Sequence, residues 1–289
     1  MDTLGYTNFL AQDYALINPF QVAERLWNKL PTHAITPKYL VGDDLKMPRI
    51  LALRELKEAT IAELFSVAKK WDLEDGNAYP FFSALLKSEV RLERLRRHIS
   101  NNMVFSADSG NNFLLRTHDP RVFRHLARIL QKEQLSRLMG PVVEWTWFDM
   151  QDKRWNICVR PSLPSPYGKL SFSQHQWDGI LRIGRLNAVM SKLSRARPGV
   201  AISDSEILRI DEGLRNAMEM DGMQNTEDQR LYALHFLRFG TDWHQQKGQS
   251  ARFDQVTAGL LSYVEAFGHI SIAEGIDNST RSSMEIADV

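Results

Sequence analysis

The chain has 289 residues, of which 43% are hydrophobic and 25% are charged, and its formal net charge is +1. This composition is typical of a folded globular protein and excludes a disordered chain as the default. The single cysteine excludes an internal disulfide, and no segment approaches the roughly 18 apolar residues of a membrane span. The first residues lack the pattern of a signal peptide, so we expect a cytoplasmic protein with no membrane span.

The charges are unevenly distributed along the chain. Residues 91–128 contain eight arginines and three acidic residues, a net charge of +5, whereas residues 201–289 carry a net charge of −8. Such asymmetry affects association with partners more than it affects the fold. We therefore expect a partner-binding protein with two different contact surfaces.

The N-terminal part alternates between short β-type runs and helical periods. We predict strands at residues 14–17, 39–41 and 49–53, a helix at residues 19–30 started by Asn18 and Pro19, and a helix carrying residues 61–68. A short buried strand follows at residues 80–86. The next helix carries residues 92–99, with Arg91, Arg94 and Arg97 on its outward face.

A hairpin and a capped helix come next. The runs at residues 103–105 and 113–116 flank the polar loop 108–111, which is typical of antiparallel neighbours. Asp119 is predicted to cap a helix whose first residue is Pro120. Gly140 and Pro141 end the following helical segment. The alternation of Val143, Trp145 and Trp147 then predicts a strand with one buried face, paired with a returning strand at residues 155–159, and we expect Trp145, Trp147 and Trp155 to lie in the core.

The remainder predicts helices. Three pairs have the spacing of capping boxes: Ser173 with Gln176, Ser203 with Glu206, and Thr226 with Gln229. Helices are expected at residues 174–195, before Gly222, before Gly240 and along the apolar stripe of residues 253–267. The fold class is α+β, with a small mixed sheet. We divide the chain into an α/β lobe at residues 1–160, a Pro/Ser-rich connector at 161–170, a helical lobe at 171–275 and a polar tail at 276–289.

The sequence contains no G-x-S-x-G elbow, phosphate loop, G-x-G-x-x-G motif or H-E-x-x-H motif, and we expect no catalytic residue and no cofactor. Cys158 is interpreted as a buried small hydrophobe rather than a reactive thiol. His118 and His125 are interpreted as solvent-facing or capping residues rather than metal ligands, because a metal site needs at least one more ligand.

The arginines allow three interpretations: a solvated helix face, a surface that docks a protein, and a nucleic-acid site. Because exposed aromatic residues do not alternate with them and the chain as a whole is not basic, we expect no nucleic-acid partner. The candidate partner-binding residues are Arg91, Arg94, Arg97, Arg116 and Arg121.

A spaced motif gives the strongest indication of function. The pattern R-x-x-D-P-R-V spans Arg116 to Val122, and G-P-V with a tryptophan follows at Gly140, Pro141, Val142 and Trp145. With the upstream arginine-rich helix, it resembles the type VI secretion adaptor-chaperone family, formerly catalogued only as a domain of unknown function. That family usually has an aromatic residue where this chain has His118. The resemblance covers about residues 12–160, and the helical remainder is similar to the family's C-terminal lobe.

The resemblance implies a non-enzymatic, cytoplasmic bacterial protein. Its partners would be a secreted effector and the VgrG spike protein, onto which it would load the effector. Two other classes remain open from the residues alone: an enzyme with an unrecognised site between the lobes, and a nucleic-acid-binding protein.

Overall fold

The computed structural model describes residues 4–40, 42, 44–73, 79–106, 112–151, 153–162, 168, 170–246 and 248–270. The chain divides into two compact units, Met1–Ile180 and Leu181–Val289. The division falls inside a long helix, α6 (Gln174–Ala196), and the lobe boundaries expected from the sequence stay predictions. Most of the expected connector and the whole of the expected tail lie outside the described residues.

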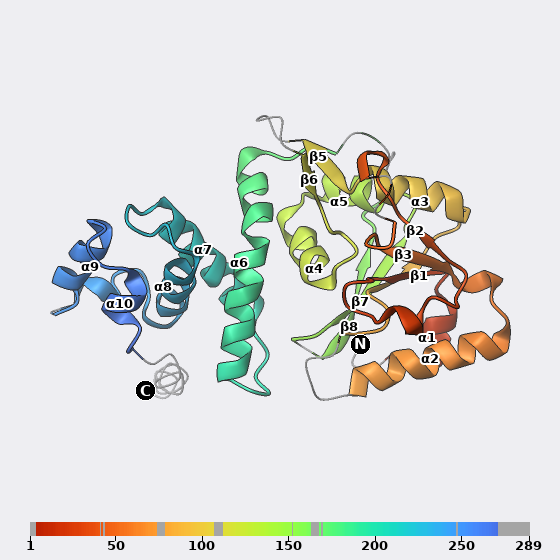
Figure 1. Cartoon of the computed structure of the whole chain (residues 1–289), viewed down its shortest axis with the longest axis horizontal. Coiled ribbons are helices and arrows are strands. Elements are labelled where there is room, and N and C mark those ends of the chain that lie inside the picture. The colour runs from red at the N-terminus through yellow and green to blue at the C-terminus, as the bar shows by residue number, and fades with distance from the viewer. Residues whose placement is uncertain are drawn as a thin grey trace, which may run out of the picture. The chain divides into compact units, whose positions relative to one another are not determined.

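The first unit is built on a six-stranded sheet with the strand order β2-β3-β1-β4-β7-β8 (Figure 1). All its pairings are antiparallel, so the expectation of a mixed sheet was wrong, although the α+β class is confirmed. Both faces are covered, which is why the central strand β1 is buried along its whole length. The strands are β1 (Tyr14–Ile17), β2 (Thr32–Ala34), β3 (Arg49–Ala52), β4 (Ala84–Lys87), β7 (Glu144–Asp149) and β8 (Arg154–Val159).

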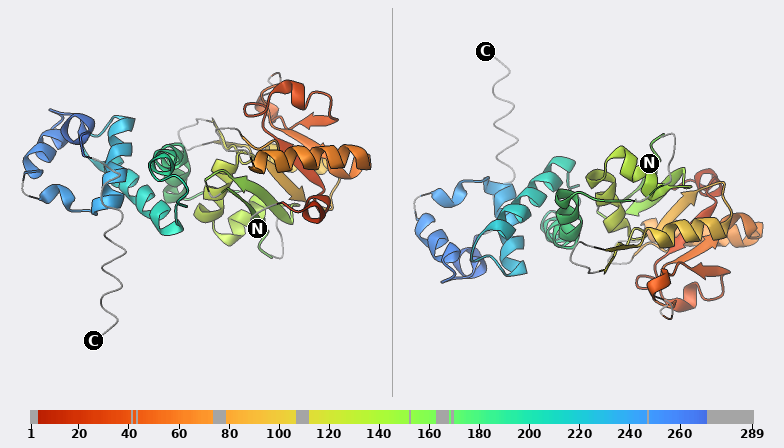
Figure 2. Two further views of the ribbon diagram at one scale, coloured as in Figure 1. Left: turned by 90° about the horizontal axis from the view of Figure 1, so that it is seen from below. Right: turned by 90° about the horizontal axis from the view of Figure 1, so that it is seen from above.

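Helices lie on both sides of this sheet, with α2 and α3 on opposite sides (Figure 2). A second, two-stranded antiparallel sheet is the predicted hairpin, whose loop lies outside the described residues. The helices are α1 (Tyr6–Leu10), α2 (Glu58–Leu73), α3 (Leu92–Asn101), α4 (Pro120–Ile129) and α5 (Lys132–Met139), with 3-10 turns η1 (Glu24–Leu26), η2 (Lys38–Leu40) and η3 (Leu53–Glu55), and the hairpin strands are β5 (Val104–Ser106) and β6 (Asn112–Leu114).

The tryptophans of β7 and β8 lie in the core, as the alternating pattern predicts. Successive side chains of a strand point to opposite faces. Trp145 therefore stacks on Phe123 of α4, while Phe148 contacts Trp155 in the apolar cluster that also contains Leu64 of α2. Strand β7 thus contributes aromatic side chains to the packing on both faces of the sheet, and β8 contributes Trp155 to one of them.

Two predicted elements near the N-terminus are wrong. Residues 19–30 form only the short turn η1, because Ala23 is extended at φ −56° and ψ 134° and the carbonyl of Val22 accepts from Trp27 Nε1 at 3.2 Å. The strand expected at residues 39–41 is also absent: Lys38–Leu40 is the 3-10 turn η2. The edge strand of this region is β2, which the sequence pattern did not indicate.

The second unit is helical, and no strand occurs among its described residues. Helix α6 begins in the first unit, and helices α7 and α8 pack closely. A Cβ on Gly213 would lie 3.0 Å from Ala233 Cα, which explains a glycine in the middle of α7. No helix in the described part of the chain is long and apolar enough to cross a membrane. The elements are α6 (Gln174–Ala196), α7 (Asp204–Glu219), α8 (Thr226–Phe239), η4 (Trp243–Gln245), α9 (Ser250–Thr257) and α10 (Tyr263–Phe267).

Two of the three predicted capping boxes are confirmed, those of Ser173 with Gln176 and Ser203 with Glu206. The third is wrong: Asn225 is the N-cap of α8, and its side chain accepts from the backbone N–H of Glu227. Helix α7 ends at Glu219 rather than at Gly222.

The apolar stripe of residues 253–267 is divided between α9 and α10. Gly259, at φ 71°, lies between them. As a result Leu260 is 74% exposed, although the stripe predicted it to be buried. A capping box of Ser262 with Glu265, not predicted from the sequence, begins α10.

Candidate partner-binding site

The buried carboxylate of Asp119 is the centre of the R-x-x-D-P-R-V motif. It caps α4 as predicted, with Pro120 as the first helical residue. Its Oδ1 accepts from the backbone N–H and from Nε of Arg121, both at 3.0 Å, and its Oδ2 accepts from Arg121 Nη2 and Arg116 Nη2, both at 2.8 Å. The Asp119 side chain is only 2% exposed. One carboxylate thus satisfies a helix N-terminus and two guanidinium groups.

The charges around Asp119 determine its ionisation. Burial acts to raise the pKa of Asp119, but the hydrogen bonds and charges of Arg121 and Arg116 outweigh it, and the pKa lies below its ordinary value. The same contacts raise the pKa of Arg121. Both arginines therefore form ion pairs with Asp119, although each arginine side chain remains 42% exposed. Their predicted role in partner binding stays a prediction.

His118 and His125 are both buried, so the expectation that they face solvent or cap the helix was wrong. Packing against the sheet encloses this end of α4, and burial lowers the pKa of His118 to about 4. His118 is therefore neutral at pH 7. It occupies the position at which we noted an aromatic residue in the family that the sequence resembles. No group of three or more His, Cys, Asp or Glu side chains suited to a metal ion occurs among the described residues.

The Gly140–Pro141 turn is the second half of the motif. Gly140 ends α5 at φ 54°, and a Cβ there would lie 2.1 Å from Cε1 of His98. His98 in turn donates from Nε2 to the carbonyl of Leu138 at 2.9 Å. The carbonyl of Pro141 accepts from Ser88 Oγ at 2.9 Å. This turn brings α5, α3 and the end of β4 together, so glycine is required by a close contact between elements.

Trp145 completes the motif through packing. Its ring lies 4.4 Å from that of Phe123 at an interplanar angle of 9°, a stacked pair that joins β7 to α4. The contacts of the motif residues are thus internal to the first unit: a helix cap at Asp119 and Pro120, a close contact at Gly140 and a stacked pair at Trp145.

The arginines of α3 have a different environment. Leu95 and Ile99 are buried on one side of the helix, and Arg91, Arg94 and Arg97 are exposed, as predicted. Arg91 is the N-cap residue and so lies just before the helix. This set of three exposed arginines is called the α3 arginine face below. A fourth arginine, Arg96, is directed toward β2, where it donates to the carbonyl of Ala34. It is not among the candidate partner-binding residues predicted from the sequence.

Arg96 forms one wall of a surface groove between α3 and the segment that includes β2. Its Nε and Nη2 donate to the carbonyl of Ala34 at 3.1 and 2.9 Å, and its Nη1 donates to Glu93 at 2.9 Å. The groove has a volume of about 420 Å³. Its lining includes Ala34, Ile35 and Lys38 on one side and Glu93, Arg96 and Arg97 on the other. Arg97 is therefore the member of the α3 arginine face that lines a concave surface.

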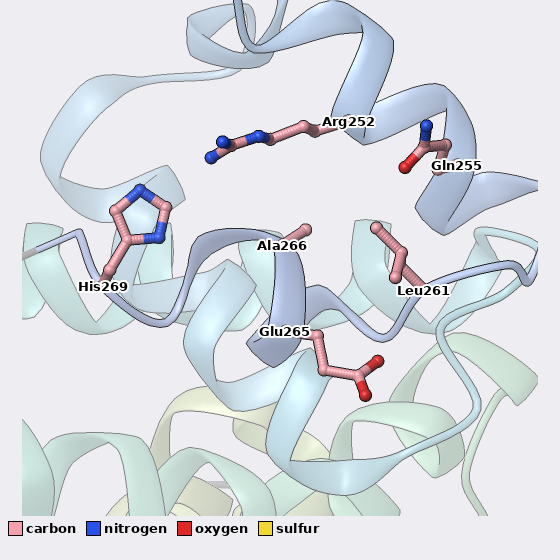
Figure 3. Close-up of a pocket in the computed structure, with 6 residues that line it drawn as sticks. All are labelled: Arg252, Gln255, Leu261, Glu265, Ala266 and His269. Atoms are coloured by element: carbon pink, nitrogen blue, oxygen red, sulfur yellow. The ribbon is translucent and has the colours of Figure 1, made fainter.

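Another groove, of about 460 Å³, lies between α9 and α10 in the second unit (Figure 3). The side chains of Arg252 and His269 point toward one another across it, and the carboxylate of Glu265 points away from them. Glu265 accepts from the backbone N–H of Ser262 at 2.8 Å, and its hydrogen bonds to Ser262 lower its pKa. Because that carboxylate caps α10, it is not placed as a partner for Arg252 or His269.

Cys158 is half-buried in β8 rather than fully buried. Its Sγ lies 3.8 Å from Met139 Sδ, and burial raises the pKa of the thiol. The thiol is therefore protonated at neutral pH and less nucleophilic than an ordinary cysteine.

Comparison with protein families matches residues 47–137 to a family described as "Domain of unknown function (DUF4123)". Comparisons with the curated proteins and with the solved structures each give no match. The matched range extends from just before β3 into α5, so it includes the α3 arginine face and the Asp119 centre. The motif positions at the Gly140–Pro141 turn and in β7 follow it. Less than half of the chain is covered, and within that part the chain is similar to the DUF4123 family.

Proposed function

We propose that this chain is a non-enzymatic bacterial adaptor that binds a type VI secretion effector in the cytoplasm and loads it onto the VgrG spike. The observation that carries the proposal is the DUF4123 match at residues 47–137, because that family is associated with type VI secretion effector adaptors. The matched range contains the arginine-rich helix and the Asp119 motif, the features by which the sequence resembles these adaptors.

The environment of α3 supports this proposal. An adaptor must capture its cargo quickly and release it later, which favours charged contacts at an exposed surface over a large buried apolar interface. The α3 arginine face provides guanidinium groups that pair with carboxylates in a bidentate geometry. It lies on a helix anchored by buried Leu95 and Ile99, so the arginines extend from a rigid element.

The charge asymmetry supports two partners. The arginine-rich stretch at residues 91–128 lies in the first unit, and the stretch with a net charge of −8 lies in the second. Surfaces of opposite charge attract different partners. In the proposed function, one partner is the effector and the other is the spike protein.

Co-purification from the native host tests the proposal. The tagged full-length chain is isolated, and the proteins that accompany it are identified by mass spectrometry. We expect a secreted toxin encoded near this chain, together with a VgrG protein. Recovery of neither would contradict the proposal, and recovery of nucleic acid in their place would favour a nucleic-acid-binding protein.

A charge-reversed pair provides the matched comparison. Arg94→Glu with Arg97→Glu should reduce the recovery of one partner. The control is Lys192→Glu with Arg195→Glu, which reverses two exposed basic residues at the same spacing on α6. Equal recovery with the two double variants would exclude the α3 arginine face as a docking surface.

A further inference from the structure

The groove between α3 and the β2 segment is lined by two basic side chains that are not paired with an acidic group in the described part of the chain. The side chains of Lys38 and Arg97 line it and are exposed. Neither side chain makes a hydrogen bond or an ion pair with any residue in the described part of the chain. Two cations that have no partner among the described residues therefore face the same concave surface.

Glu93, the one carboxylate among the described residues that line the groove, does not cancel these charges. Glu93 is paired with Arg96 Nη1, at 2.9 and 3.1 Å from its two oxygens. Arg96 is itself fixed, because its other nitrogens donate to the carbonyl of Ala34 on the edge strand β2. Glu93 and Arg96 thus neutralise one another, and among the described lining residues the net charge comes from Lys38 and Arg97.

The rest of the lining suits a peptide chain. Asn101 contributes an exposed carboxamide, whereas Ile35 lines the groove but is only 1% exposed. Ser100 does not offer its hydroxyl, which donates to the carbonyl of Thr36 at 2.9 Å. The hydroxyl of Thr36 is also engaged, because it donates to Asp44 Oδ1. The side-chain polar groups that remain among the described lining residues are two cations and one amide, a set that favours carboxylates over cationic or apolar side chains.

We infer that this groove binds an acidic segment of a protein partner, with a carboxylate of that segment paired to Arg97 and Lys38. The inference rests on the proposed function, in which the partner is the secreted effector. It assigns the recognised chemistry, a segment rich in Asp or Glu, and it assigns the place where the segment binds. Glu93 and Arg96 hold the wall of the groove and are not expected to contact the carboxylate.

A binding titration with the full-length chain tests this inference. The probe is a fluorescein-labelled ten-residue peptide that alternates glutamate with alanine, and the control peptide has glutamine in place of glutamate. We expect saturable binding of the glutamate peptide that weakens as salt increases. Binding of the glutamine peptide should be at least about tenfold weaker, because it lacks the charged hydrogen bonds. No saturable binding, or equal binding of the two peptides, would overturn the inference.

Two double variants localise the binding. Lys38→Gln with Arg97→Gln should weaken the glutamate peptide by about tenfold or more, since both charge-assisted contacts are lost. Arg25→Gln with Lys29→Gln removes the same charge from two exposed residues of the first unit outside the groove lining, and should change the affinity less than about twofold. Equal losses in the two variants would overturn the groove as the site. Unchanged melting midpoints verify that both variants fold.

The pull-down distinguishes this inference from the proposed function. If the groove variant retains the effector at the wild-type level, the groove inference fails while the adaptor function stands. If the wild-type chain recovers neither effector nor spike protein, the adaptor function fails. The peptide titration then decides separately whether the groove binds acidic segments.

Discussion

Two sets of arginines in the first unit have opposite environments. Arg116 and Arg121 hold the buried carboxylate of Asp119, whereas the α3 arginine face, Arg91, Arg94 and Arg97, is exposed. In the sequence the two sets look alike, and all five residues are candidates for partner binding. The difference shows that the sequence alone does not separate arginines that pair with a buried carboxylate from arginines on an exposed helix face.

The largest expected effect is the loss of the carboxylate itself. Asp119→Ala removes the N-cap of α4 and leaves two guanidinium groups without their counter-charge. We expect a loss of roughly 4 kcal/mol in the free energy of unfolding, because breaking a buried ion pair is more costly than losing a cap alone. Chemical denaturation followed by tryptophan fluorescence measures it.

Asp119→Asn is the matched control for this change. Asparagine also caps helices well, so this variant keeps the cap and removes only the charge. If it lost as little as about 0.5 kcal/mol, the ion pairs would contribute little to stability, and the contrast between Arg116 and Arg121 and the exposed arginines would fail.

Gly140→Ala should have the next largest effect. The new methyl group would overlap the ring of His98, and φ 54° with ψ −110° is strained for any residue with a Cβ. We expect a loss of about 3 kcal/mol from the strain and the displaced histidine. Gly5→Ala is the control, since Gly5 has φ −75° and its added Cβ would come no closer than 3.8 Å to Asn8. A similar midpoint of denaturation for the two variants would show that the close contact at Gly140 is not required.

The burial of His118 predicts a dependence of stability on pH. Its pKa is lowered to about 4, so the unfolded chain takes up the proton first as the pH falls below the ordinary value of 6.5. The stabilising effect of the neutral ring is complete above that value and is lost as the pH falls toward about 4, a change of up to about 3 kcal/mol.

His118→Phe tests this dependence, because phenylalanine is aromatic and cannot titrate. We expect the variant to gain stability relative to the wild type as the pH falls from 7 to 4. Denaturation curves at several pH values measure the difference between the two proteins. A difference that stays constant over this range would show that His118 does not titrate as its burial implies.

The smallest effect on stability is expected on the α3 arginine face. Arg94→Glu with Arg97→Glu should change the free energy of unfolding by less than about 0.5 kcal/mol, because both side chains are exposed. Its effect should appear in binding instead: the association rate with the purified effector at low salt should fall by about tenfold or more, and most of its salt dependence should disappear. Association at the wild-type rate would assign these arginines to the solvated surface.

The sequence predicted the parts of the fold that depend on local signals. Asp119 with Pro120, and Ser203 with Glu206, mark helix starts through side chains that reach adjacent backbone N–H groups. By contrast, the helix expected at residues 19–30 is replaced by η1, because the indole N–H of Trp27 donates a hydrogen bond to the carbonyl of Val22. That contact depends on how the segment packs, and no local pattern indicates it.

The candidate site was predicted only in part. The outward position of Arg94 and Arg97 follows from helical periodicity, since Leu95 and Ile99 mark the buried side. The groove could not be predicted, because Lys38 and Arg97 are far apart in the sequence. They line the same groove only because the segment that includes β2 lies beside α3, and β2 was not predicted. The burial of His118 was missed for a similar reason: the packing of α4 on the sheet determines it.

Effector secretion by the native host tests the central claim most directly. The gene for this chain is deleted, and the effector and VgrG are measured in the culture medium by immunoblotting, with the wild-type gene restored as a control. Our account predicts that VgrG is still released, that the effector is absent from the medium although it is still synthesised, and that the restored gene returns it. Effector release at the wild-type level without this chain would contradict the account.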